Sequence, residues 1–464
     1  MHKIIYSSLL LSTFVLANVV VPSTGSDLKI TIYNKSKAFI HDTREVTLQA
    51  GKQKLVYEGV PSSVITESVV PTFTGLATKL YSQNYIYDLI SLKSMLAKSI
   101  NQEVSFYSNE KEPTLNKGIL LSSTPKVMIK EKRTGKIFSL NSATQVIFEK
   151  VPKNMITKPS LIWNMEAKVG GKMGIDLKYL AGAISWKSDY VVNMKKDTLD
   201  LKGWITVKND SGVAYENAQI TCLAGDINMM PEPSRYRENL VYGASMPTAM
   251  MERNLVKEES FSGYHIYKIP FRETIANKEQ KQISFIAQNE VKYQQYGQYI
   301  NNYFEKGAEQ QLQFSNIIEF ENKKENNMGM ALPSGVMRMY QKDSSGETHF
   351  IGESRVENIP EDENVTLTVG TLFDAVGEKI VSKYVAKKHH KNVETTYTVR
   401  NQGKEPLLLR LEENIPVYGN DISLKTSCQD NCSVKKKSAF VREFSIKLAP
   451  KEKYRFTSEF EVNY

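Results

Sequence analysis

The sequence predicts a mainly β protein, built from antiparallel β-sandwich domains with a small inserted SH3-like β-barrel and one short helix. Apolar and polar residues alternate along most of the chain, which is the period-two pattern of half-buried strands. Clusters of Gly, Asn and Asp separate the alternating segments at short intervals, as turns between strands do. Only one segment has the three- and four-residue spacing of an amphipathic helix.

The first 17 residues predict export. His2 and Lys3 precede an apolar run from Ile4 to Leu16, and Ala17 follows it. This is the pattern of a signal peptide cleaved after Ala17, which would place the mature protein in the periplasm or at the cell surface. The run of about 13 residues is shorter than the roughly 20 that span a bilayer, so a retained anchor is the weaker alternative.

Residues 18–85 predict an N-terminal β domain. Leu28, Ile30 and Ile32 alternate with polar neighbours, and the strand-like segments 46–48 and 55–57 flank turn residues 49–52. We expect the two segments to form a hairpin.

Residues 86–157 predict a short helix followed by the small barrel. Apolar residues recur at Leu89, Leu92, Leu96 and Ile100, which indicates an amphipathic helix over 88–101 with Asp88 and Ser91 able to cap it. Four short strand-like segments then follow, at 118–122, 126–130, 136–140 and 145–150. Short strands at this spacing are typical of a small barrel.

Residues 158–464 predict a large β-sandwich domain. Tight turns are expected at Gly170-Gly171-Lys172 and at 209–212, between long alternating strands. The alternation is lost at 226–262, which we interpret as a mobile loop that carries or covers a binding surface, with a disordered insertion without a role as the alternative. Its candidate binding residues are Asp226, Met229 and Met230.

A Tyr-, Gln- and Asn-rich ribbon is expected at 293–314. Tyr293, Tyr296 and Tyr299 could present stacking surfaces to a sugar or to a partner strand, or they could belong to an ordinary edge hairpin.

Several phrases, taken in their order along the chain, resemble one bacterial family. The phrases are AGAISWKSDY (181–190), LKGWITV (201–207), NDSG (209–212), LAGDIN (223–228), LPSGV (332–336), FIGE (350–353) and VGTLFD (369–374). Together they resemble the mucoidy-inhibitor-like family, the domain of unknown function 4139 family. The resemblance implies an exported β-protein and supplies no catalytic residues. Many relatives carry a long coiled coil where this chain has only the expected short helix.

The chain is basic, with a net charge of +9 that falls to about +8 when Lys3 leaves with the signal peptide. An exported basic protein favours an envelope protein or anionic polysaccharide as partner, with peripheral membrane contact as a further option and without nucleic acid. The charge could also serve solubility alone. The segment around His389-His390 carries the candidate anion-binding residues Lys387, Lys388 and Lys391, whose charge opposes metal binding.

Known catalytic patterns are missing from the sequence. It contains neither His-Glu-x-x-His nor Gly-x-Ser-x-Gly, so no catalytic, cofactor or metal residue is assigned. The acidic pairs, including those at 361–363 and 412–413, are expected to be solvated turns. Cys222 alternates with core residues and is expected to be buried and inert. Cys428 and Cys432 flank a turn and are expected to form a disulfide, which an exported protein permits.

These observations favour an envelope-associated binding or structural protein of unknown ligand. A hydrolase acting on envelope polysaccharide and an outer-membrane β-barrel are the alternatives. The oligomeric state stays open.

Overall fold

A computed structural model describes residues 18–23, 27–87, 89–108, 114–140, 142–152, 155–225, 227–228, 256–261, 263–307, 309–415 and 421–463. The described chain is mainly β, as the alternation predicts, and α1 (Leu92–Lys98) is the one α-helix in it. Short 3₁₀ turns occupy Thr66–Ser68, Ala143–Gln145 and Lys324–Asn326. No helix among the described residues has the length and apolar content to cross a membrane.

The chain divides into two compact units, each described by itself. The first comprises residues 1–185, 208–222 and 271–281, and the second comprises residues 186–207, 223–270 and 282–464. The expected segments 18–85, 86–157 and 158–464 do not coincide with these units, because strands beyond residue 158 complete the sheets of the first unit.

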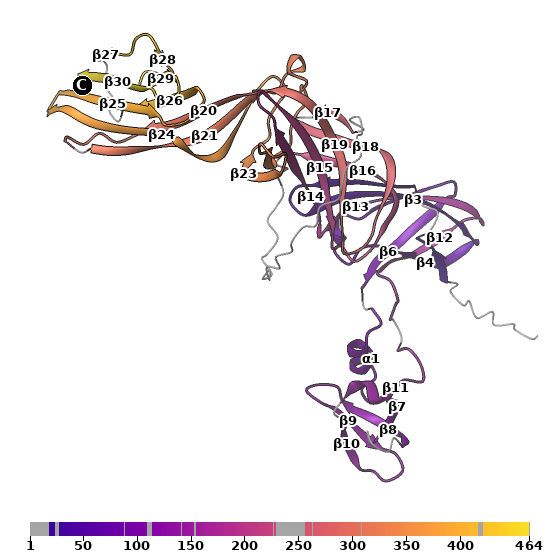
Figure 1. The fold of residues 1–464 in the computed structure, drawn as a ribbon. Helices are drawn as coiled ribbons and strands as arrows, with labels where there is room; N and C mark the ends of the chain where they lie inside the picture. The colour runs from indigo at the N-terminus through magenta and orange to yellow at the C-terminus, as the bar shows by residue number, and fades with distance from the viewer. Residues whose placement is uncertain are drawn as a thin grey trace, which may run out of the picture. The chain divides into compact units, whose positions relative to one another are not determined.

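A four-stranded sheet in the first unit has the order β1-β4-β12-β6 (Figure 1). Its strands are Asn18–Val21 (β1), Gly51–Glu58 (β4), Ser160–Ala167 (β12) and Thr78–Ile86 (β6). A seven-stranded sheet, most of which belongs to the same unit, has the order β17-β18-β16-β2-β3-β13-β5. Its strands are Lys257–Phe261 (β17), Tyr264–Ile275 (β18), Tyr215–Ala224 (β16), Asp27–Tyr33 (β2), Lys37–Leu48 (β3), Gly171–Gly182 (β13) and Val70–Thr74 (β5).

Side chains from the inner faces of these two sheets meet in a sandwich core. Trp163 of β12 is fully buried and lies 5.3 Å from the Tyr57 ring of β4 and 5.5 Å from the Phe73 ring of β5, measured between centroids. The alternation that predicted each strand explains the arrangement, since every second side chain points inward.

The three tight turns expected to link adjacent strands instead connect different sheets. β3 pairs with β2 and β13, whereas β4 pairs with β1 and β12, so the hairpin expected over 46–57 is wrong. The Gly170-Gly171-Lys172 turn leads likewise from β12 in one sheet to β13 in the other, and residues 209–212 lead from a third sheet into the sheet of β13. Alternation identifies the inward face of a strand but carries no information about its neighbour.

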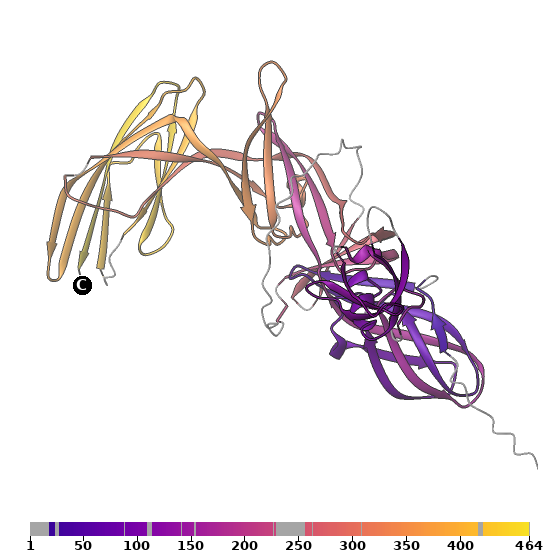
Figure 2. The ribbon, with the colours of Figure 1, turned by 90° about the horizontal axis from the view of Figure 1, so that it is seen from below.

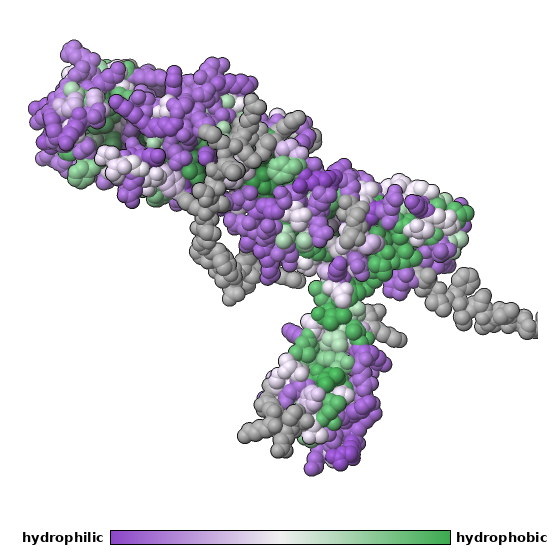
Figure 3. Space-filling model, turned by 45° about the vertical axis from the view of Figure 1, so that its right-hand side comes forward, coloured by the Kyte–Doolittle hydropathy of each residue, from purple (hydrophilic) through white to green (hydrophobic). Residues whose placement is uncertain are grey.

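A small β domain is inserted in the first unit. Its five-stranded sheet has the order β10-β9-β8-β7-β11, with strands Ile137–Leu140, Val127–Glu131, Leu115–Ser122, Glu103–Tyr107 and Val146–Ile147. Leu96 of α1 packs into its core, as the amphipathic pattern predicts, and Ser91 caps the helix by accepting a hydrogen bond from the Ser94 amide. Apolar side chains also gather on the surface of this domain (Figure 3).

The second unit contains most of a five-stranded and a whole nine-stranded sheet. The first has the order β19-β15-β14-β22-β23, with strands Glu279–Lys292, Thr198–Asn209, Ile184–Met194, Gly335–Lys342 and Thr348–Val356. The second has the order β27-β30-β25-β24-β21-β20-β26-β29-β28. Its strands are Asp421–Thr426, Lys453–Asn463, His390–Asn401, Asn364–Lys387, Glu309–Glu321, Gln294–Asn301, Leu407–Asn414, Val441–Leu448 and Cys432–Lys436.

The two edge strands of the nine-stranded sheet, β27 and β28, are consecutive in the sequence. The short connection between them brings the opposite edges of the sheet close together, so the sheet curls over its own core (Figure 2). Its ribbon β20–β21 is the antiparallel pair predicted for 293–314. β17 occupies the end of the segment 226–262 that was expected to be a loop.

Candidate functional site

Two charged residues lie on the inward face of β3. Ala38, Ile40, Asp42 and Arg44 alternate with outward residues and are all buried. The first two are ordinary core residues, whereas the last two place a carboxylate and a guanidinium inside the sandwich of the first unit. Buried charges of this kind require partners, because their transfer out of water is costly.

One carboxylate oxygen of Asp42 accepts three hydrogen bonds. Its Oδ2 accepts hydrogen bonds from Arg44 Nε at 2.9 Å, from Arg44 Nη2 at 2.6 Å and from the Tyr57 hydroxyl at 2.8 Å. Arg44 Nη1 donates to the backbone carbonyls of Pro22 at 3.0 Å and Glu58 at 2.7 Å. The guanidinium also lies 3.9 Å above the Tyr57 ring centroid, so it is held on several sides.

The other oxygen of Asp42 has no partner. Asp42 is 2 % exposed, and its Oδ1 is buried without a hydrogen-bond donor among the described residues. Leaving such an acceptor unpaired costs about 1–3 kcal/mol. Asp42 lines a cavity of about 320 Å³, which we name the Asp42 cavity; its other lining residues include Arg44, Lys158, Tyr179, Tyr215 and Glu216.

A second unpaired group lines the same cavity. Tyr215, the first residue of β16, is buried, and its hydroxyl makes no hydrogen bond of good geometry in the described part of the chain. Burial raises the pKa of Tyr215 to about 12 and outweighs a smaller lowering by the nearby Ser211 side chain, so the group stays a protonated hydroxyl at neutral pH. Burial also raises the pKa of Tyr179, and nearby Tyr215 and Asp42 raise it further. The cavity therefore offers an acceptor and hydroxyl donors in one place.

The residues proposed from the sequence do not lie in this cavity. Asp226, Met229 and Met230 lie outside the described residues. Lys387 and Lys388 are exposed at the tip of the β24–β25 hairpin. The hairpin tip stays a predicted anion-binding surface, with Lys391 Nζ 5.3 Å above the Tyr384 ring centroid.

The three tyrosines of the 293–314 ribbon make contacts within the protein. The Tyr293 hydroxyl donates to the Lys195 carbonyl at 2.8 Å, and the Tyr296 hydroxyl donates to Glu319 at 2.8 Å. Arg410 stacks 3.8 Å from the Tyr296 ring centroid, and Tyr299 packs against the core of the nine-stranded sheet. Their use as a stacking surface for a ligand stays a prediction.

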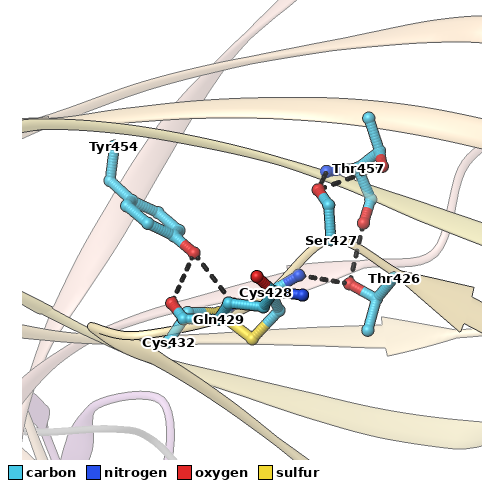
Figure 4. The surroundings of a disulfide bond; sticks show 7 residues. All are labelled: Thr426, Ser427, Cys428, Gln429, Cys432, Tyr454 and Thr457. Carbon is cyan, nitrogen blue, oxygen red and sulfur yellow. Dashed lines mark hydrogen bonds between the residues drawn. A yellow bond between two sulfur atoms is a disulfide. The ribbon is translucent and has the colours of Figure 1, made fainter.

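Cys428 and Cys432 form a disulfide in the connection between β27 and β28 (Figure 4). The Tyr454 hydroxyl accepts a hydrogen bond from the Gln429 amide at 3.1 Å and donates one to the Gln429 carbonyl at 2.8 Å, which fixes the loop. The disulfide thus closes a small loop at the start of β28, within the connection between the two edge strands. Cys222 is buried as predicted, and burial raises the pKa of its thiol.

One cluster has the composition of a metal site. Asp343, Glu347 and His349 lie close together, but all three are exposed. Asp343 accepts hydrogen bonds from the amides of Ser345 at 2.8 Å and Glu347 at 3.1 Å. Hydrogen bonds from Ser345 and His349 lower the pKa of Asp343 to about 2. The carboxylate therefore holds the β22–β23 turn, and we assign no metal to it.

The prediction of a solvated turn at 412–413 is wrong. Both residues lie on β26, and Glu413 is 0 % exposed. Its two oxygens are both paired: Oε1 accepts from the Tyr397 hydroxyl, and Oε2 accepts from Arg442 Nε at 2.6 Å and from the Ser458 hydroxyl. Leu409 and Leu411 share its face of the strand, so the alternation of this strand already indicated an inward position.

The sequence contained a signal for the Asp42 cavity as well. Asp42 and Arg44 continue the inward-facing alternate positions that begin with Ala38 and Ile40. Two opposite charges at such positions predict a buried ion pair. The contribution of Tyr57, from another sheet, was not visible in the sequence.

The chain belongs to the domain of unknown function 4139 family, whose family model matches residues 175–464. The comparison with curated proteins gives no match. Within the Asp42 cavity, Tyr179 and Tyr215 belong to the matched segment, whereas Asp42, Arg44 and Lys158 precede it.

Proposed function

We propose that this member of the domain of unknown function 4139 family is an exported envelope protein that binds a small ligand in the Asp42 cavity. The observation that carries the proposal is that Asp42, whose Oδ1 is buried and unpaired, lines the cavity. A ligand that donates a hydrogen bond there would remove the cost of the unpaired acceptor. Binding sites combine a mainly apolar wall with a few such polar groups.

Two features support export and envelope association. The first 17 residues have the signal-peptide pattern, and disulfides such as Cys428–Cys432 persist in oxidising compartments. The net charge of +9 favours contact with anionic envelope polymers, and the β24–β25 hairpin tip is the surface we propose for that contact. N-terminal sequencing of the exported protein should find Asn18 first, and an intact Met1 would contradict export with cleavage.

Ligand binding is tested with a panel of three chemical classes. Glucose and N-acetylglucosamine represent neutral sugars, glucuronate and phosphate represent anions, and choline and ethanolamine represent cations. A ligand that binds only the folded protein raises the melting temperature. We expect at least one class to stabilise the wild type and to stabilise Tyr215→Phe less. If no class does so, or if both proteins respond alike, the proposed binding role is wrong.

A hydrolase is the second candidate, because Glu216 lines the same cavity as Asp42. Glycosidases use two carboxyl groups that flank the scissile bond. The wild type would then release new reducing ends from a neutral oligosaccharide, and Glu216→Gln would abolish the release while keeping the binding. Binding without release of reducing ends supports the binding protein over the hydrolase.

A further inference from the structure

Building on the proposed binding role, we propose that the Asp42 cavity receives one neutral, hydroxyl-rich ring, either as a free monosaccharide or as the terminal residue of an envelope glycan.

The two unpaired groups have complementary hydrogen-bonding roles. Asp42 Oδ1 can only accept, whereas the Tyr215 hydroxyl can donate one hydrogen bond and accept others. A ligand hydroxyl can donate to the carboxylate and accept from the tyrosine, and a ring that carries neighbouring hydroxyls can do both at once. An anion would also bring a second negative charge close to the Asp42 carboxylate.

The charges that line the cavity balance. Asp42 and Glu216 are acidic, and Arg44 and Lys158 are basic. Asp42 is already neutralised by Arg44, whose Nη2 lies 2.6 Å from its Oδ2. A cationic ligand at Oδ1 would therefore meet the guanidinium on the same carboxylate, and an anionic ligand would meet the carboxylate itself. A neutral ligand avoids both repulsions.

The size and the remaining walls also fit a single ring. A volume of about 320 Å³ is at the lower end of the range for small-molecule sites, which begins at about 300 Å³. Tyr179 and Tyr215 provide aromatic surface, and Leu28 and Val213 provide aliphatic surface. Aromatic rings suit the apolar C–H face of a sugar while their hydroxyls bond its edge. The cavity has room for one sugar ring, so a long polysaccharide would enter it only by its terminal sugar.

Calorimetric titration of the full-length mature protein tests the ligand class. The probes are glucose, N-acetylglucosamine and their methyl glycosides, with a neutral oligosaccharide for the terminal residue of a glycan. We expect at least one neutral probe to bind, and Tyr215→Phe to weaken its binding about tenfold. Asp42→Asn should weaken it at least tenfold. Tyr267→Phe is the matched control, because its buried hydroxyl donates to the Ala331 carbonyl at 2.9 Å in the second unit.

If Asp42→Asn fails to fold, Tyr215→Phe still tests the site, because it removes a hydroxyl that makes no hydrogen bond of good geometry in the described structure. Binding of the free sugar alone identifies a monosaccharide, and equal binding of the glycosides and oligosaccharide identifies a glycan end. If only glucuronate, phosphate, choline or ethanolamine binds through Tyr215, the neutral-ring inference is overturned and the binding role stands. If nothing binds and the cavity holds water only, both are overturned.

Discussion

Each unit contains a buried ion pair between a carboxylate and an arginine, but the two carboxylates differ in how many of their oxygens have hydrogen-bond partners. In the first unit Asp42 and Arg44 form a buried ion pair, and in the second unit Glu413 and Arg442 form another. Glu413 has partners on both oxygens, whereas Asp42 has partners on Oδ2 alone. Both carboxylates are almost wholly inaccessible, so exposure does not explain the difference.

The network around Glu413 extends further. Asn301 Nδ2 donates to the Tyr397 hydroxyl at 2.7 Å, and Lys379 Nζ donates to Asn301 Oδ1 and to the Tyr303 carbonyl. A buried polar network that is complete rigidifies a core. Glu413 thus shows that side chains of this protein can supply hydrogen-bond partners to both oxygens of a buried carboxylate. Asp42, which lines a cavity and has one unpaired oxygen, is therefore the better candidate for a ligand.

The largest expected effect comes from breaking each ion pair. Glu413→Gln leaves the buried Arg442 without its counter-ion and should lower the free energy of unfolding of the second unit by about 3–5 kcal/mol. Asp42→Asn should cost less, about 1–3 kcal/mol, because Arg44 keeps two carbonyl partners and the cavity borders the site. Chemical denaturation of the full-length protein measures both. Equal losses would show that Asp42 belongs to a closed core.

The pH dependence of stability sharpens the comparison at Lys379. Burial lowers the pKa of Lys379 to about 8 from its ordinary 10.5, although nearby Glu413 raises it. Between these two values the unfolded lysine binds a proton that the folded one does not, so stability should rise as the pH rises from 8 toward 10.5. The gain should be on the order of 1–3 kcal/mol.

Lys379→Met should remove this rise, because its side chain cannot titrate. The exposed Lys447 lies on β29 of the same sheet, and Lys447→Met is the control that should keep the wild-type slope. Denaturation midpoints measured from about pH 8 to about pH 9.5, in steps of roughly half a pH unit, give the slope of stability against pH for each protein. A wild-type slope that Lys379→Met leaves unchanged would assign the dependence to other groups.

Removing the disulfide should have a smaller effect, confined to the second unit. The double variant Cys428→Ser, Cys432→Ser loses a bridge that closes a short loop, worth about 2 kcal/mol. Reductant should lower the stability of the wild type to that of the double variant and leave ligand binding at the Asp42 cavity unchanged. Alkylation without reductant, followed by peptide mapping, should label neither Cys428 nor Cys432. Rapid native labelling of Cys222 would contradict its burial.

The smallest effect distinguishes a paired from an unpaired hydroxyl. Tyr267→Phe removes a hydrogen bond to a buried carbonyl and should cost about 1 kcal/mol. Tyr215→Phe removes an unpaired hydroxyl and should stay within about 0.5 kcal/mol of the wild type. Denaturation without ligand measures the difference. A clear loss with Tyr215→Phe would mean that this hydroxyl already has a partner in the folded protein.

Strand content, the small β domain and the buried positions could be read from the sequence, because they depend on local alternation. The helix needed only the spacing of its apolar residues, although its observed length is Leu92–Lys98 rather than 88–101. The disulfide needed only two cysteines on either side of a turn, together with the expectation of export. The burial of Glu413 was also predictable, because Glu413 continues the inward-facing positions of Leu409 and Leu411. The prediction of a solvated turn followed instead from its charge.

The pairing of strands and the Asp42 cavity depend on the tertiary structure. A two-residue period shows which face of a strand is buried, yet hydrogen-bond ladders join strands that lie far apart in the chain, such as β3 and β13. The cavity forms where side chains at positions 42, 179 and 215, from three strands, meet the short segment around Lys158. The Oδ1 atom of Asp42 lacks a hydrogen-bond partner because these elements converge without supplying a donor for it.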